Sequence, residues 1–134
     1  MKGRFSFIVR DEALDFDDIS RKLKIRPTSI TKKGEFIRKK MGIQAPYDIW
    51  LFEVIITEEL EPEEALDELL NKLTPNFKEI NELIWIYTEV NINCYLRSDY
   101  GQMGLELSIE LIKKLAYLGV GLNIHILSFG GVKS

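Results

Sequence analysis

Residues 86–97 have the sequence IYTEVNINCYLR, and this stretch decides the fold. Its apolar positions are Ile86, Val90, Ile92, Cys94 and Leu96, and its aromatic and polar positions are Tyr87, Glu89, Asn91, Asn93, Tyr95 and Arg97. Because strand side chains alternate between the faces of a sheet, this pattern predicts a strand over 85–97 with one apolar and one wet face. Such a sheet has helices on one side only, so its wet face is free to contact a partner.

Three other segments have the composition of strands. They are Arg4–Arg10, Ile49–Thr57 and Val120–Leu127, and the second is apolar along nearly its whole length. The side chains expected to point inward are Phe5, Phe7 and Val9 in the first strand and Leu122, Ile124 and Ile126 in the last.

Apolar residues at helical spacing predict helices between these strands. The stripes are Phe16, Ile19 and Leu23; Leu66, Leu69, Leu70 and Leu73; Phe77, Ile80, Leu83 and Ile84; and Leu111, Ile112, Leu115 and Leu118. Asp17 or Asp18 is expected to cap the first helix and Ser108 the last, because short oxygen-bearing side chains accept from free backbone N–H groups. Gly119 suits the left-handed position after the last helix.

The order of elements predicts an α+β single domain over residues 1–134. We expect a four-stranded, mainly antiparallel sheet with helices packed on one face. This arrangement is ferredoxin-like, with a helical insertion between strands 2 and 3. The alternative is a more open sheet whose extra helices cover part of its second face.

Composition places the chain among globular proteins. It has 134 residues, 46% of them hydrophobic and 29% charged. No apolar run approaches the ~20 residues needed to span a bilayer, and Phe5–Val9 is too short for the core of a signal peptide. The single cysteine excludes an internal disulfide, so we expect a cytoplasmic protein that does not enter membranes.

Charge is divided unevenly along the chain. Residues 1–40 hold twelve basic and six acidic residues, whereas residues 41–134 hold six basic and fifteen acidic ones. Many of the basic residues lie in Thr28–Pro46, which we expect to be an exposed loop with a hairpin arm. Such polarity steers charged partners at long range without naming them.

Several motifs resemble one known family. They are Asp17–Ser20, Leu23–Thr28, Lys32–Glu35, Trp50, Leu107–Ile112 and Leu115–Gly119. Together they are similar to the bacterial domain-of-unknown-function family 4279, over nearly the whole chain. The resemblance implies a small stand-alone bacterial protein with no assigned enzymatic activity, and it supplies no catalytic residues. Some small families of this kind serve as immunity proteins in toxin systems.

Few residues offer chemistry of their own. His125 is the only histidine, so no cluster of metal ligands forms around it, and we expect neither a metal nor a cofactor. Cys94 lies on the apolar side of its strand and is expected to be a core thiol. The enzyme alternative requires His125 to act as a general base beside Glu89 or Asp99.

The predicted wet face is the main candidate for binding. Its members are Tyr87, Asn91, Asn93, Tyr95 and Arg97, with His125 on the neighbouring strand. Tyrosine and arginine are enriched at interface hot spots, which favours a protein partner. Arg26 and Lys33 form a second candidate, an anion site beside backbone amides that the turn after Pro27 leaves free.

These residues support competing functions. The leading interpretation is a binding module that recognises another protein through the open sheet face, as an immunity or regulatory protein would. Nucleic-acid binding is the alternative, through base stacking on the aromatic face and phosphate contacts from the loop at 32–40. A homodimer paired through either edge of the sheet is compatible with both functions.

Overall fold

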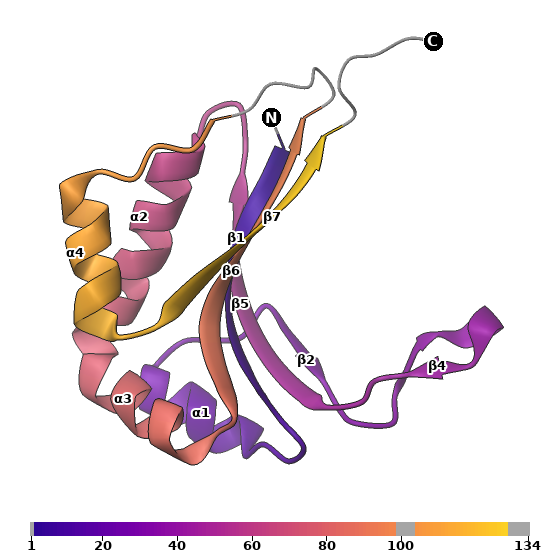
Figure 1. Cartoon of the computed structure of the whole chain (residues 1–134). Helices are drawn as coiled ribbons and strands as arrows, with labels where there is room; N and C mark the ends of the chain where they lie inside the picture. Colours follow the sequence, from indigo (N-terminus) through magenta and orange to yellow (C-terminus); the bar gives the residue numbers. More distant parts are fainter. Residues whose placement is uncertain (1, 99–103, 129–134) are drawn as a thin grey trace, which may run out of the picture.

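The computed structural model describes residues 2–98 and 104–128. Its main sheet has five strands in the order β2-β5-β1-β6-β7, and a separate two-stranded sheet pairs β3 with β4. The strands are β1 (Lys2–Asp11), β2 (Ser29–Thr31), β3 (Phe36–Arg38), β4 (Ile43–Gln44), β5 (Asp48–Ile56), β6 (Glu89–Ser98) and β7 (Gly121–Ser128). The helices lie on one side of the main sheet, as Figure 1 shows. The predicted α+β class is therefore confirmed.

The helices begin and end where the local sequence provides caps. They are α1 (Phe16–Leu23), α2 (Pro62–Leu73), α3 (Phe77–Ile86) and α4 (Ile109–Leu118), with short 3₁₀ turns η1 (Lys39–Met41) and η2 (Thr74–Asn76). Ser108 caps α4 as predicted, because its Oγ accepts from the Leu111 N–H at 3.2 Å. Asp15 caps α1 and accepts from the Asp18 N–H at 3.0 Å, so the predicted cap at Asp17 or Asp18 is wrong.

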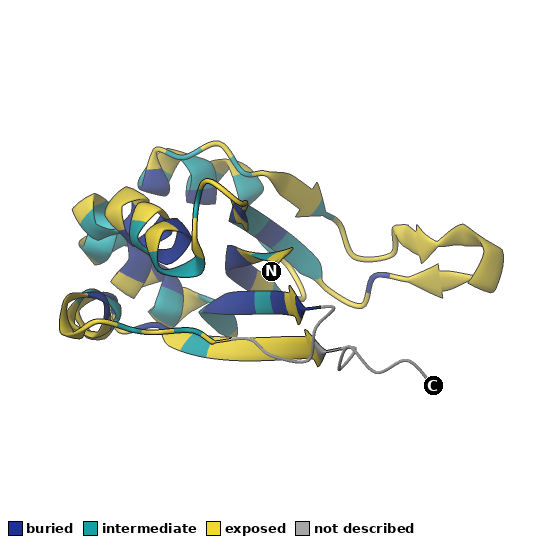
Figure 2. Cartoon of the chain, turned by 90° about the horizontal axis from the view of Figure 1, so that it is seen from above, coloured by how far each residue is buried: buried dark blue, intermediate teal, exposed yellow. Residues whose placement is uncertain are grey.

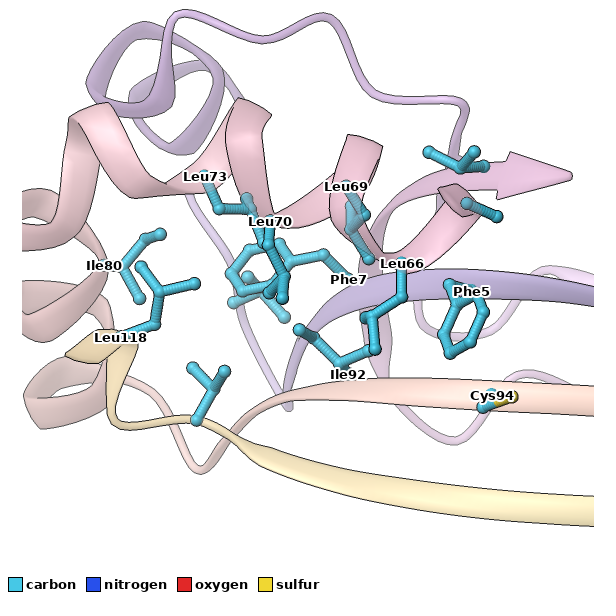
Figure 3. Packing of buried hydrophobic residues seen from close by; sticks show 14 of the residues in the cluster. Phe5, Phe7, Leu66, Leu69, Leu70, Leu73, Ile80, Ile92, Cys94 and Leu118 are labelled. Carbon is cyan, nitrogen blue, oxygen red and sulfur yellow. The ribbon is translucent and has the colours of Figure 1, made fainter. Parts of the chain in front are cut away.

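The core lies between the sheet and the helices. Figure 3 shows Phe5 and Phe7 of β1 facing the leucines of α2, with Ile92 of β6 beside them. Trp50 of β5 is also fully buried, and its indole N–H donates to Ser20 Oγ of α1 at 3.0 Å. The predicted alternation in β6 is confirmed for Ile92, Cys94 and Leu96, which all belong to this core.

Strand pairing departs from the ferredoxin-like prediction. The central strand β1 runs antiparallel to both β5 and β6, whereas β6 and β7 are adjacent and parallel. In a split strand–helix–strand unit another strand lies between the two strands. The unit β1–α1–β2 is split in this way, because β5 lies between its two strands, whereas the strands of the unit β6–α4–β7 are direct neighbours. The fifth strand, β2, comes from the predicted loop and pairs with β5. The helical insertion between the second and third predicted strands is present as α2 and α3.

The start of β6 was also predicted wrongly. Helix α3 continues to Ile86, and β6 begins only at Glu89. Trp85 is therefore a helical residue, and 90% of its surface is exposed. The local sequence is ambiguous here because the apolar residues before Glu89 satisfy both a helical stripe and a strand.

The apolar side of β7 is less covered than predicted. Leu122 packs against the core, but Ile124 and Ile126 are exposed, as is Ile112 of α4. Alternation predicts that Ile124 and Ile126 are buried, but β7 lies at the edge of the sheet. The helix layer does not cover the far part of this strand, so alternation alone overestimates its burial.

Gly3 of β1 packs closely against the backbone of β6, and this contact generates a stability prediction. A Cβ at Gly3 would overlap the Tyr95 carbonyl oxygen, which belongs to the backbone and cannot rotate away. Gly3→Ala should therefore lower the free energy of unfolding by about 2 kcal/mol or more, measured by urea denaturation. Gly121→Ala is the matched control in β7, because a Cβ there meets no atom of the described residues within 4 Å. Equal stability of the two variants would contradict the close packing at Gly3.

Candidate functional site

The side of the main sheet away from the described helices is called the open face here. Residues of β1 and β6 that alternate with the core residues point to it, beginning with Arg4 on β1 and Tyr95 on β6. Side chains directly opposite on neighbouring strands lie about 5 Å apart, so the strand register places residues in rows across this face. One row, at the end where β1 begins, consists of Ile55, Arg4, Tyr95 and His125.

This Tyr95 row is held together by ring and charge contacts. The Tyr95 and His125 rings stack with centroids 4.8 Å apart and planes inclined by 13°. On the other side of Tyr95, the Arg4 guanidinium carbon lies 4.5 Å from the ring centroid. Arg4 Nε also pairs with Glu53 Oε2 at 3.4 Å. Because β6 lies between β1 and β7, the two neighbours approach Tyr95 from opposite sides.

A hollow of about 760 Å³ opens at this end of the sheet, and we call it the end hollow. Arg4, Tyr95 and His125 line it together with Arg97 of β6. The other lining residues include Lys2, Ile55, Glu58, Ile126 and Leu127. The end hollow therefore combines apolar surface, stacked rings and mainly positive charge.

The middle of the open face is closed by its own polar side chains. Asn93 is only 9% exposed, and its Oδ1 accepts from Asn123 Nδ2 at 3.2 Å. Ser6 lies directly opposite on β1 and is fully buried. The prediction that Asn93 faces water is therefore wrong, because flanking strands crowd this central position.

The far end of the open face is occupied by an ion pair. Arg10 pairs with Glu89, and its guanidinium carbon also lies 5.1 Å from the Tyr47 ring centroid. Asn91 is half-buried, and its Nδ2 donates to Glu89 Oε1 at 3.0 Å. Of the predicted platform, Tyr95 and Arg97 come together with His125, whereas Asn91 and Asn93 lie further along β6.

Tyr87 does not belong to the open face. It precedes β6, packs against the core, and its hydroxyl oxygen accepts from the Asp15 N–H at 3.2 Å. The side chain thus joins the end of α3 to the cap of α1. Its prediction as a platform residue is wrong, because β6 begins at Glu89, four residues after the predicted start at 85.

Arg26 and Lys33 are exposed, and neither lines the end hollow. The Lys33 N–H donates to Asp48 Oδ1 at 2.7 Å, and Asp48 Oδ2 accepts from the Leu14 N–H at 3.0 Å. A carboxylate of the chain itself therefore satisfies the Lys33 amide, so this amide is not free to bind an anion.

Sequence reasoning missed Arg4, Ile55 and Leu127 as neighbours of the candidate residues. Arg4 was detectable as an outward residue, because it alternates with the inward Phe5 and Phe7. Its position opposite Tyr95 follows only from the register of β1 against β6. Ile55 and Leu127 lie in apolar runs, where alternation does not distinguish an exposed residue from a buried one.

The described residues hold no group of three or more His, Cys, Asp or Glu side chains placed to bind a metal ion. Within the same residues, no helix is long and apolar enough to cross a membrane. The structure does not bring Glu89 and His125 together as the enzyme alternative requires. His125 lies opposite Tyr95, and Tyr95 is six residues from Glu89 along β6, or about 20 Å. Asp99 lies outside the described residues.

The fold and the open face define an α+β protein with helices on one side of a five-stranded sheet. The chain belongs to the family described as domain of unknown function DUF4279, whose model matches residues 1–129. The resemblance found in the sequence is therefore confirmed. No curated protein and no solved structure matches the chain.

Cys94 lies on the core side of β6 and should be chemically inert. It is fully buried, and this burial raises the pKa of its thiol to about 11. At pH 8 the native thiol is then almost wholly protonated, and the thiolate is the reactive form. A disulfide reagent should react at least about 100-fold more slowly with native protein than with protein unfolded in urea. Equal rates would contradict the burial of Cys94.

Proposed function

We propose that this protein is a binding module that recognises a protein partner through the end hollow of its open face. The observation that carries the proposal is the Tyr95 row, where stacked rings and a guanidinium border exposed apolar side chains. Ile55 and Leu127 each expose half or more of their surface beside that row. Aromatic and arginine side chains next to apolar surface are the composition of protein-binding hot spots.

The contacts within the row favour tight binding for a second reason. Tyr95 is held between Arg4 and His125, and Arg4 is held in turn by Glu53. Side chains already fixed in position lose little conformational entropy when a partner covers them. The row is thus preorganised for contact with a protein surface.

Nucleic-acid binding is the alternative, and the same contacts make it less favourable. A base stacks on an aromatic side chain by lying against a free ring face. Arg4 and His125 already occupy both sides of the Tyr95 ring. Phosphate contacts by the basic residues would remain, and they would make binding strongly dependent on salt.

In its most concrete form, the proposed function is that of a bacterial immunity or regulatory protein acting in the cytoplasm. The acidic excess of residues 41–134 supports a basic partner, such as a nuclease toxin, because opposite charge accelerates encounter. Co-expression with neighbouring toxin genes tests this form. Protection together with a stable complex is expected, and absence of both would exclude the immunity role.

A comparison of two charge reversals tests the binding site itself. Tagged wild type, Arg4→Glu and Arg21→Glu would be used to capture proteins from cells of the native host. Arg21 is the matched control, because it also pairs with a carboxylate, Asp18, but lies on α1 in the helix layer. Wild type and Arg21→Glu should both capture at least one common protein. The captured amount of that protein should fall about 10-fold or more with Arg4→Glu.

Two outcomes would contradict the proposal. Identical sets of proteins captured by wild type and Arg4→Glu would remove the end hollow as the binding site. Binding of labelled RNA that weakens steeply with salt and is lost in Arg4→Glu would favour the nucleic-acid alternative. Circular dichroism of both variants checks that each is folded.

A further inference from the structure

The segment Lys32–Tyr47 forms an arm that extends away from the rest of the protein (Figure 1, Figure 2). It contains the β3–β4 hairpin with η1 at its tip, and its base is closed by the Gly34 N–H donating to the Ala45 carbonyl oxygen at 2.9 Å. Every residue of the arm except Ala45 is exposed. The arm is therefore a structured projection rather than the plain loop that its composition also permits.

The arm exposes several large apolar side chains to solvent. Phe36, Ile37 and Met41 each expose more than half of their surface, and Ile43 more than a third. A lone two-stranded hairpin is only marginally stable in water, and clustered exposed apolar residues mark interaction sites. The exposed apolar side chains of the arm therefore favour contact with another surface.

Charge restricts what that surface is. The arm holds five basic residues, Lys32, Lys33, Arg38, Lys39 and Lys40, against one acidic residue, Glu35. Among the described residues, Lys39 and Lys40 make no ion pair. A surface that covers the arm must therefore offer both carboxylates and apolar contact.

The chain itself carries such a surface on α2. A hollow of about 480 Å³ there is lined by Leu60, Glu64, Asp67 and Glu68, with Asn71 and Lys72. Asp67 already pairs with Lys114, but the exposed side chains of Glu64 and Glu68 make no ion pair or hydrogen bond with the described residues. Glu64 and Glu68 are four residues apart, so they lie on one side of the helix.

We propose that the arm of one molecule docks on the acidic hollow of α2 in a second copy of this chain. Figure 1 shows the arm and α2 on opposite sides of the main sheet, so the arm does not reach α2 within one molecule. A two-fold symmetric dimer would make this contact twice, because each copy supplies one arm and one hollow. This dimer is independent of the partner proposed for the end hollow.

The alternative dimer would pair two sheets through the free edge of β7. That strand has no Lys, Arg, Asp or Glu residue, and Ile126 exposes 61% of its surface. The other edge, β2, is only three residues long. The arm is favoured because its charge complements a second surface of the same chain, whereas β7 offers no charge to complement.

Reciprocal charge reversal tests the arm dimer. One variant, Lys39→Glu/Lys40→Glu, makes the arm tip acidic, and the other, Glu64→Lys/Glu68→Lys, makes the α2 hollow basic. All four residues are exposed, so both variants should fold, as circular dichroism would check. Sedimentation velocity over a range of concentrations at ~50 mM salt should show a wild-type dimer, because this salt screens the charges weakly. Each variant alone should raise the dimer dissociation constant about 100-fold or more.

An equimolar mixture of the two variants should form a heterodimer. In that mixture the acidic arm meets the basic hollow and the basic arm meets the acidic hollow, so both contacts become attractive. Ile126→Lys, which places a charge on the β7 edge, is the control and should leave the dimer unchanged.

Three results would overturn the proposal. The first is a wild type that stays monomeric at every concentration in ~50 mM salt. The second is a failure of the mixed variants to associate. The third is a dimer that survives both charge reversals but is lost in Ile126→Lys, which would assign the interface to the β7 edge. If the arm binds RNA while the protein stays monomeric, the first result applies and the proposal is overturned.

Discussion

Phe5 and Phe7 of β1 pack, together with Ile92 and Cys94 of β6, against the leucines of α2, and the rest of the structure depends on this contact. Because it buries one face of the two central strands, every alternate side chain on those strands must point to the other face. Arg4 and Tyr95 reach the open face for this reason alone. Burial of each large apolar side chain contributes about 2 kcal/mol, so a slip of one residue in register would be strongly unfavourable.

The two ends of the open face differ in the groups that they leave free to contact a partner. At the Glu89 end, the Glu89 carboxylate pairs with Arg10 and accepts a hydrogen bond from the Asn91 amide. At the opposite end, the Tyr95 row borders exposed apolar residues and the end hollow. A protein partner is proposed for that end because preorganised rings and uncovered apolar surface occur together there.

Much of the local structure was predictable from neighbours along the chain. The leucine spacing of α2, the Ser108 cap and the left-handed Gly119, with φ of 71°, are all encoded within a few residues. The Cys94 thiol was likewise recognised as a core group from alternation. Tyr87 was misplaced because the helix α3 and the strand β6 have compatible patterns where they meet, and Asn93 because alternation gives the face of a residue but not the crowding around it.

Local sequence alone predicted correctly which residues of β1 and β6 share a face, where α4 begins, and that the basic residues gather in one segment. These properties depend on periodicity, capping and composition, which act between residues close in the chain. Only the tertiary structure decided that β6 lies between β1 and β7, and hence that Arg4, Tyr95 and His125 form one row. Strand order and register follow from packing between residues that are up to about ninety positions apart, and no local pattern records that choice.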